Sequence, residues 1–367
     1  MLIAPGHRRG AANPPRSKSH LHRLLIADFL AGDLSRLADD PGDPEDIKAT
    51  KRCLKALAGR DSSPVLDCGE SGSTLRFMAP VAAALGKKPT FRKAGRLADR
   101  PAIEYDAIRS GLHELRGDVS SQFVTGLLFA LPLLEGDSRI RFTTPLESRG
   151  YVDMTLDVVR GAGVVVEERE DGFDVPGSQA FRPQPDVEAE TDWSGAAFWL
   201  VANAIGSDVA VDGLNPCSAQ PDRHVVDALA TIAGRAPGRD ALDVSQFPDS
   251  FPALAVAAAC TPGETVFVGT RRLRIKESDR VAAMADVLTR FGVEATAEEA
   301  SFAVRGAAGK LKGGRFTSYG DHRIAMSIAV GATCAQSEVE IDDVACAAKS
   351  YPKFFDEFQE MDVFEGR

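Results

Sequence analysis

The chain has 367 residues, of which 44% are hydrophobic and only 7% aromatic, and its formal net charge is −10. This length predicts two domains, because single hydrophobic cores rarely grow beyond about 250–300 residues. The acidic balance argues against a general nucleic-acid binder, which needs a basic face. The apolar runs fall short of the about 20 residues that span a bilayer, so we expect no membrane association.

The N-terminus and the cysteines indicate the compartment. Residues 1–10 contain no apolar segment of the kind found in a secretory signal. The six cysteines follow no Cys-x-x-Cys spacing, which favours buried, reduced thiols over disulfides or a zinc site. We therefore expect a cytoplasmic protein.

One kind of segment recurs six times along the chain: a short polar opening followed by an apolar stretch of about helical length. The apolar stretches cover residues 21–30, 75–85, 123–134, 196–205, 251–260 and 324–332. The polar openings before them are Ser17–Ser19, Ser71–Ser73, Ser120–Gln122, Asp192–Ser194, Pro248–Ser250 and Gly320–His322. Stretches that are apolar all round predict buried helices. Their polar starts favour bound anions, because free N–H groups and the helix dipole are positive there.

A longer repeat covers parts of both halves. The segment from Asp157 to Gly177 matches the segment from Asp286 to Gly306 at eight positions, with a constant offset of 129 residues. Each copy predicts a helix, a Gly-Val turn into a strand, and a hairpin. The segment Tyr105 to Leu115 begins like a third copy and ends early. Duplicated units of this kind predict an α/β fold built from repeats.

Basic residues concentrate beside the polar openings although the chain is acidic. Lys18 and Arg23 flank the first opening, Arg76 lies one turn into the second helix, and Arg323 belongs to the sixth opening; residues 271–280 form the densest cluster. A cation at a helix start is disfavoured by the helix dipole unless an anion completes the site. A single arginine is more often a solvated surface residue, but the recurrence predicts ligands with several negative charges. Nucleic acid is disfavoured because these clusters lack interleaved aromatic residues.

Carboxylates stand among these cations. Asp249 and Glu277 are candidates for proton transfer, because nearby cations hold an acid ionised and suit it to act as a base. We interpret Asp279 and Asp321 as ion-pair partners. The chain has no His-Glu-x-x-His, Gly-x-Ser-x-Gly or P-loop motif, so metal, serine-nucleophile and ATP-hydrolysing chemistry lack support.

The order of these motifs carries a resemblance that spans nearly the whole chain. The motifs are Ser17-Lys18-Ser19-x-x-x-Arg23, Gly69–Arg76, Arg100-Pro101, Ser120-Ser121-Gln122, Ser148-x-x-Tyr151, Asp192-x-Ser194, Pro248-Asp249, Lys276–Arg280, Asp321-His322-Arg323 and Lys349-x-x-Pro352. In this order they resemble the 5-enolpyruvylshikimate-3-phosphate synthase family of enolpyruvyl transferases.

The resemblance implies a fold as well. The family has a two-domain inside-out α/β barrel, each domain built of three βαβαββ repeats around buried helices. On this basis we expect one domain from residues 13–189 and a second from residues 1–12 and 190–367. A stretch usual in the family is absent between Leu115 and Gly117, so one repeat of the N-terminal domain is expected to be abridged.

The activity implied is transfer of the enolpyruvyl group of phosphoenolpyruvate to the 5-hydroxyl of shikimate 3-phosphate, with release of phosphate. This is a step of the shikimate pathway to chorismate and the aromatic amino acids. The resemblance implies small-molecule substrates, no metal or organic cofactor, and no nucleic-acid or membrane partner; we expect a monomer.

By matching position, the resemblance also implies site residues. Asp249 would be the base for the 5-hydroxyl, Glu277 the acid toward C3 of phosphoenolpyruvate, and Lys18 would share proton transfer. Shikimate 3-phosphate would contact Lys18, Ser19, Arg23, Ser120, Ser121, Gln122, Ser148, Tyr151, Asp249 and Lys276. Phosphoenolpyruvate would contact Lys18, Gly72, Arg100, Gln122, Arg280, Arg323 and Lys349. Arg272 stands where the family often has an asparagine that contacts substrate.

Three alternatives remain open. A UDP-N-acetylglucosamine enolpyruvyl transferase shares fold and donor, but residues 92–100 contain no counterpart of its usual cysteine-bearing loop. An RNA 3′-phosphate cyclase would need nucleotide chemistry that no motif supports. A catalytically silent anion-binding homologue is made plausible by the missing stretch, but the chain keeps Lys18, Asp249, Glu277 and Lys349 together.

Overall fold

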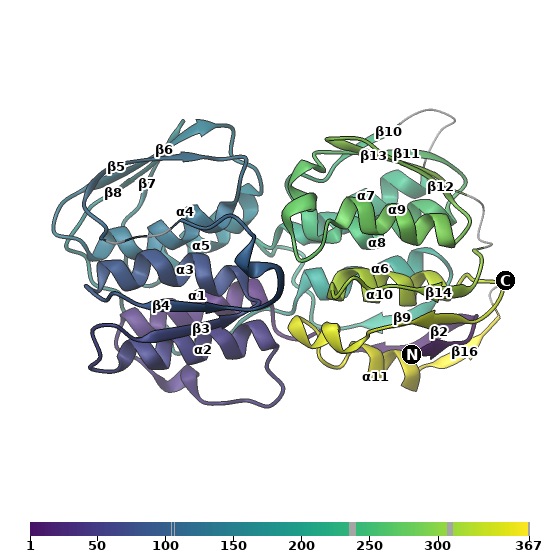
Figure 1. Ribbon diagram of the computed structural model, residues 1–367, viewed down its shortest axis with the longest axis horizontal. Helices are drawn as coiled ribbons and strands as arrows, with labels where there is room; N and C mark the ends of the chain where they lie inside the picture. The colour runs from purple at the N-terminus through teal and green to yellow at the C-terminus, as the bar shows by residue number, and fades with distance from the viewer. Residues whose placement is uncertain (104, 106, 235–239, 307–310, 366–367) are drawn as a thin grey trace. The chain divides into compact units, whose positions relative to one another are not determined.

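The computed structural model describes residues 1–103, 105, 107–234, 240–306 and 311–365, which form two compact units (Figure 1). The N-terminal unit is Arg16–Glu190, and the C-terminal unit is Met1–Pro15 with Thr191–Arg367. The chain therefore passes between the units after residues 15 and 190, where the sequence predicted residues 12 and 189. Beside these crossings, the Ser17 amide donates to the Glu190 carbonyl at 2.6 Å, and the Asp192 amide to the Pro15 carbonyl at 2.9 Å.

The N-terminal unit contains five helices and two sheets in its described residues. The helices are α1 (Lys18–Leu30), α2 (Glu45–Ala58), α3 (Gly72–Ala84), α4 (Ser121–Ala130) and α5 (Arg149–Gly161), with short 3-10 helices η1 (Ser35–Leu37), η2 (Gly95–Ala98) and η3 (Leu131–Leu133). The strands are β3 (Val65–Gly69), β4 (Thr90–Lys93), β5 (Gly111–Arg116), β6 (Ser138–Thr144), β7 (Glu167–Arg169) and β8 (Gly172–Val175). They form a parallel pair β3-β4 and a four-stranded sheet in the order β5-β6-β8-β7.

The C-terminal unit has three sheets in the part that the structure describes, in the orders β10-β11-β13-β12, β16-β2-β9 and β1-β15-β14. The helices are α6 (Trp193–Ala204), α7 (Val225–Ala233), α8 (Phe251–Cys260), α9 (Arg280–Arg290), α10 (His322–Ala332) and α11 (Phe354–Glu360). The 3-10 helices are η4 (Pro221–His224), η5 (Pro248–Ser250), η6 (Arg271–Ile275) and η7 (Ala345–Lys349). The strands are β1 (Leu2–Ile3), β2 (His7–Ala12), β9 (Asp208–Val211), β10 (Asp240–Asp243), β11 (Gly263–Val268), β12 (Glu294–Ala297), β13 (Ser301–Gly306), β14 (Gly314–Phe316), β15 (Val339–Ile341) and β16 (Asp362–Phe364).

The two four-stranded sheets have the same topology. One follows the order β5-α4-β6-α5-β7-β8, and the other follows β10-α8-β11-α9-β12-β13. In both, the first two strands are parallel, and the last strand is antiparallel to the second and to the third. The helix, Gly-Val turn and hairpin predicted from the repeat at offset 129 are present in both copies.

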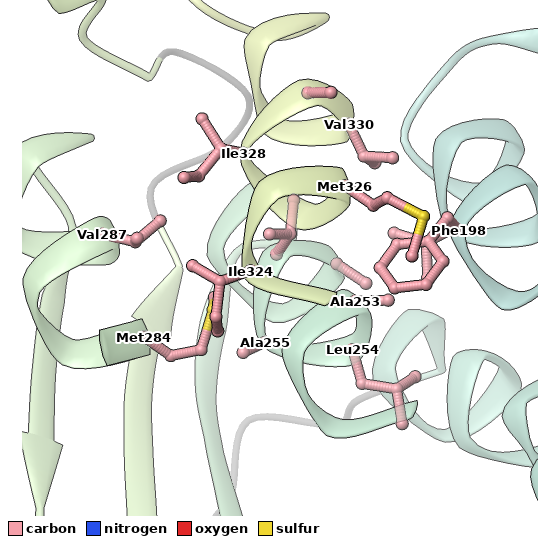
Figure 2. Packing of buried hydrophobic residues seen from close by; sticks show 14 of the residues in the cluster. Phe198, Ala253, Leu254, Ala255, Met284, Val287, Ile324, Met326, Ile328 and Val330 are labelled. Carbon is pink, nitrogen blue, oxygen red and sulfur yellow. The ribbon is translucent and has the colours of Figure 1, made fainter. Parts of the chain in front are cut away.

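The six predicted buried helices are α1, α3, α4, α6, α8 and α10. In α10 every residue is buried, and in α8 every residue except Cys260. Figure 2 shows Ile324, Met326 and Val330 of α10 beside the alanine-rich α8. Small alanine side chains allow neighbouring helices to approach closely. Helices therefore make the centre of this core, and their polar starts are fixed by it.

The structure corrects the expected place and form of the abridged repeat. The missing stretch was expected between Leu115 and Gly117, but residues 111–116 form one strand, β5, which pairs with β6 through Arg116 with one register shift after Leu115. The gap in the pattern follows β4 instead. Between Lys93 and Gly111, the described residues hold only η2, so the β3-β4 pair has no following helix and hairpin like those of the four-stranded sheets.

Candidate active site

Asp249 is the centre of a charge cluster in the C-terminal unit. It lies in η5, directly before α8. Its carboxylate pairs with three cations, which lie on α9, on α10 and directly after η6. Oδ1 accepts from Arg280 Nη1 at 2.9 Å and from Lys276 Nζ at 3.3 Å, and Oδ2 accepts from Arg323 Nη2 at 3.0 Å. The start of α8 thus presents an acid to the starts of α9 and α10.

These contacts set the charge states in the cluster. Burial alone would raise the pKa of Asp249, but Arg323, Lys276 and Arg280 together hold it well below its usual range. Burial is the main cause that lowers the pKa of Lys276 to about 8; Arg280 and Arg272 act in the same direction, and Asp249 opposes the shift. The cluster therefore holds an ionised carboxylate and a lysine able to exchange a proton near neutral pH.

Arg280 connects the candidate base to the candidate acid. Its guanidinium, 1% exposed, donates from Nη2 to Glu277 Oε2 at 2.8 Å and from Nε to Asp321 Oδ2 at 2.8 Å. Asp321 is fully buried, accepts the Ser278 hydroxyl at 3.0 Å, and caps α10 through the Arg323 amide. Asp321 is therefore an ion-pair partner that orients Arg280, as its position in the sequence indicated.

Two further candidates lie in the same unit. Lys349 ends η7 and is 8% exposed. Arg272, where the resemblance implies an asparagine, is 7% exposed in η6, four residues before Lys276. Asp279, the other acid interpreted as an ion-pair partner, caps α9 through the Ala282 amide and pairs with Arg274 at 3.3 Å.

Arg23 is the most deeply held cation of the N-terminal unit. It lies on α1, is 2% exposed, and donates from Nε to Thr155 Oγ1 at 2.8 Å and from Nη2 to the Tyr151 carbonyl at 2.8 Å. Both partners belong to α5, so Arg23 ties the start of α5 to α1. Its charge is thereby placed beside Tyr151. Ser148, the residue directly before α5, has a left-handed φ of 57°. Such a conformation is strained for serine and is often found at functional sites.

The start of α3 is built around Gly72. A Cβ at this position would lie 2.6 Å from Arg76 Nη1 and 3.0 Å from Arg100 Nη1. Arg76 Nη1 donates to Gln122 Oε1 at 2.6 Å, and Gln122 Nε2 donates to Ser73 Oγ at 2.9 Å. Two guanidinium groups therefore lie against the bare backbone at a helix start, which is a favourable place for an anion.

The first opening carries Lys18, whose Nζ donates to Asp46 Oδ2 of α2 at 2.9 Å. Asp46 was missed by the sequence reasoning, because it belongs to none of the motifs and is 28 residues away from Lys18. Arg76 was noticed as a cation, but its link to Gln122 was not. Both residues are recognisable only once the helices are packed.

The predicted site residues form two groups, one in each unit. Asp249, Lys276, Glu277, Arg280 and Arg323 are linked by direct ion pairs in the C-terminal unit. In the N-terminal unit the candidates gather at the helix starts: Lys18, Ser19 and Arg23 on α1, Gly72 on α3, Ser120, Ser121 and Gln122 at α4, and Ser148 and Tyr151 at α5, with Arg100 against Gly72. Within the described residues, no group of three or more His, Cys, Asp or Glu side chains could hold a metal ion. No helix in that part of the chain is long and apolar enough to cross a membrane.

The chain is similar to known proteins along almost its entire length. The family model for EPSP synthase (3-phosphoshikimate 1-carboxyvinyltransferase) matches residues 96–358. A 3-phosphoshikimate 1-carboxyvinyltransferase of Clostridium kluyveri is 38% identical over 415 aligned positions, covering 98% of this chain and 96% of the relative. One from Clostridium perfringens strain SM101 is 34% identical, with 98% of both chains covered. The alignments are longer than this chain, so the relatives carry residues that have no counterpart here.

Solved structures show the same fold at lower sequence identity. An EPSP synthase of Acinetobacter baumannii superposes with a TM-score of 0.73 at 22% identity, covering 99% of this chain and 98% of the other. The enolpyruvyl transferase NikO of Streptomyces tendae gives a TM-score of 0.67 at 14% identity, with 99% and 98% covered. From the family model and the relatives more than 30% identical, the chain belongs to the EPSP synthase (3-phosphoshikimate 1-carboxyvinyltransferase) family.

Proposed function

We propose that this chain transfers the enolpyruvyl group of phosphoenolpyruvate to the 5-hydroxyl of shikimate 3-phosphate and releases phosphate. Membership of the family supports the reaction, which belongs to the shikimate pathway to chorismate and the aromatic amino acids. The single observation that carries the chemistry is the Asp249 cluster. It places an ionised carboxylate and Glu277 on the same arginine, Arg280.

In the first step the 5-oxygen bonds to C2 of phosphoenolpyruvate. Asp249 accepts the hydroxyl proton, and Glu277 donates a proton to C3. In the second step the C2–O bond to phosphate breaks, C3 gives a proton back to Glu277, and the double bond forms again. The departing phosphate takes up the proton that Asp249 accepted in the first step. Lys18 would neutralise the departing phosphate and share in proton transfer, since a lysine is a compact charge with donor protons.

The cations around Asp249 explain how so weak a base could act. Arg280 and Arg323 are proposed ligands of phosphoenolpyruvate, and Lys276 is a proposed ligand of shikimate 3-phosphate. When the substrates' anionic groups bind these three side chains, Asp249 shares its cations with the substrates and its pKa rises. The base would then become effective only in the loaded enzyme.

The N-terminal unit would supply the remaining contacts. Arg100 and Gln122, with the backbone at Gly72, are proposed to bind phosphoenolpyruvate. Bidentate guanidinium groups suit carboxylate and phosphate, and Gly72 leaves the backbone accessible to the ligand. The proposed contacts to shikimate 3-phosphate in this unit are Lys18, Ser19, Arg23, Ser120, Ser121, Gln122, Ser148 and Tyr151.

The same family membership supports a structural proposal. We assign the units as the two enolpyruvyl transferase domains of an inside-out α/β barrel, with the repeat containing β3 and β4 abridged. A monomer in the cytoplasm, without metal or organic cofactor, is the state proposed for the active protein.

Release of inorganic phosphate tests the function. The protein is mixed with phosphoenolpyruvate and shikimate 3-phosphate, separately and together, and phosphate is measured over time. Release only with both substrates is expected. Equal release when UDP-N-acetylglucosamine replaces shikimate 3-phosphate would refute the assignment, and no release with any pair would favour a silent anion-binding homologue.

A further inference from the structure

Asp222 is a buried carboxylate that links the starts of two core helices in the C-terminal unit. It lies in η4 and is 1% exposed. Its Oδ2 accepts the hydroxyl of Ser194 on α6 at 2.7 Å, and its Oδ1 accepts the hydroxyl of Ser250, the N-cap residue of α8, at 2.7 Å. Both serines are buried, at 6% and 0% exposure. One carboxylate thus fixes the position of one helix start relative to the other.

Ser250 is the residue that follows Asp249. The Asp249 carboxylate contacts cations on α9, on α10 and directly after η6, so its position depends on where η5 holds the backbone. The Ser250 hydroxyl anchors the backbone to Asp222 at the residue directly after Asp249. Loss of this anchor would let the start of α8 relax and carry Asp249 away from its partners.

The anchor itself is fixed by Gln220. Its Oε1 accepts the Trp193 amide at 3.1 Å, and its Nε2 donates to the Thr191 carbonyl at 2.9 Å. The short segment from Gln220 to Asp222 is therefore clamped onto the start of α6. Asp222 is therefore held in place by α6, and it fixes the start of α8 through the hydrogen bond from the Ser250 hydroxyl.

The N-terminal unit uses the same spacing for a functional side chain. Lys18 and its carboxylate partner Asp46 are 28 residues apart, and so are Ser194 and Asp222. Lys18 and Ser194 each lie in the first turn of a core helix, and each acid is the second residue of its own helical segment. In the N-terminal unit the carboxylate is that of Asp46, which contacts the proposed catalytic Lys18 directly. In the C-terminal unit it is that of Asp222, which contacts Ser250, the neighbour of the proposed base Asp249.

We infer that Asp222 is a positioning residue that acts through Ser250 to set the Asp249 carboxylate among Lys276, Arg280 and Arg323. This inference rests on the proposed function. It assigns different roles to the hydrogen bonds that Asp222 accepts from the two serines: the bond from Ser250 serves catalysis and the bond from Ser194 serves stability.

The two serines provide a matched pair of variants. Ser250→Ala and Ser194→Ala each remove one hydroxyl at 2.7 Å from the same acid, so both should lower the melting temperature by a similar small amount. Ser250→Ala should lower kcat by about tenfold or more, because misplacing a reacting group by about 1 Å can cost about 100-fold. Ser194→Ala should keep kcat within about twofold of the wild-type value.

The acidic limb of the kcat profile is a readout that general destabilisation would not move. In Ser250→Ala the limb should shift to higher pH, because Asp249 would lose contact with cations that lower its pKa. Ser194→Ala should leave the limb unchanged. Asp222→Asn can accept from one serine and donate to the other, so it should retain more kcat than Asp222→Ala.

The outcomes separate this inference from the function on which it rests. A wild-type protein that releases no phosphate with both substrates refutes the proposed function. An active wild type in which both serine variants lose kcat equally, with unmoved acidic limbs, overturns the role of Asp222 alone.

Discussion

Arg323 holds Asp249 at two places: Nη2 donates to the carboxylate Oδ2 at 3.0 Å, and Nη1 donates to the backbone carbonyl at 3.3 Å. The same guanidinium therefore fixes both the charge and the backbone of the proposed base. A lysine could not reproduce this fork, because its ammonium group is a single point of charge. This relationship links the sixth helix start to the fifth.

Arg323→Lys should keep the fold but impair binding and base chemistry together. We expect KM for phosphoenolpyruvate to rise about tenfold or more, since a bidentate anion contact is lost, and kcat to fall. Steady-state kinetics with each substrate varied in turn measures both effects. Arg290→Lys is the matched control, because Arg290 pairs with Asp286 on the exposed side of α9. Equal kinetics in Arg323→Lys and the control would contradict the role of Arg323.

Because the pKa of Lys276 is lowered, we expect substrate binding to weaken at alkaline pH. Its pKa is lowered to about 8, so its positive charge is present below that pH and is lost as the pH rises through it. The kcat/KM for shikimate 3-phosphate should therefore decline above about pH 8, because this parameter reports groups of the free enzyme. In Lys276→Arg the decline should disappear from this range, since arginine stays charged. A decline that persists unchanged in Lys276→Arg would exclude Lys276 as its source.

Glu277→Gln should suppress turnover without unfolding the protein. The amide keeps the shape of the side chain and can still accept from Arg280, but it cannot deliver a proton to C3. We expect kcat to fall by about 100-fold or more, the usual contribution of a general acid, with a melting temperature close to that of the wild type. Exchange of deuterium from solvent into C3 of phosphoenolpyruvate should slow in parallel. Normal exchange in this variant would assign the proton to another group.

Gly72→Ala should weaken phosphoenolpyruvate binding selectively. The new methyl group would meet the ends of Arg76 and Arg100 at 2.6 and 3.0 Å, so these flexible side chains must move away from the helix start. We expect a higher KM for phosphoenolpyruvate with little change in the KM for shikimate 3-phosphate. Gly42→Ala serves as the control, because the nearest atom to its new methyl group is Asp40 Oδ1 at 3.3 Å. A proportional rise of both KM values would indicate general distortion of the unit.

Lys18→Met tests the other unit. The substitution removes the charge that pairs with Asp46 but keeps an unbranched side chain of similar length. Turnover should fall by about 100-fold or more, while circular dichroism and melting remain near wild type. Near-normal turnover would remove Lys18 from the mechanism.

Local patterns in the sequence predicted the helices well. The six buried helices and the two matching hairpins could be located because apolar runs, caps and Gly-Val turns are local signals. The Asp249 cluster was also foreseen in part, since Lys276, Glu277 and Arg280 follow one another closely in the chain. Ion pairs between distant elements could not be predicted from the sequence, because they depend on how the helix starts pack.

The local pattern and the structure differ around residues 105–116. The segment 105–115 begins like a copy of the repeat, which placed the missing stretch after Leu115, yet residues 111–116 form one strand, β5, with β6 as a parallel partner. Tertiary pairing decided the structure there over the local pattern. Asp46 and Asp222 were missed for a similar reason. Each is an ordinary acid in the sequence and gains its role from a helix start 28 residues away.

The central claim is most directly tested by identifying the product. Shikimate 3-phosphate and phosphoenolpyruvate labelled with carbon-13 are incubated with the protein, and the products are analysed by mass spectrometry and phosphate assay. We predict shikimate 3-phosphate that has gained one labelled enolpyruvyl group, with one phosphate released per molecule, in the wild type and not in Asp249→Asn. Unlabelled shikimate 3-phosphate after prolonged incubation, or equal labelling of UDP-N-acetylglucosamine in its place, would contradict the account.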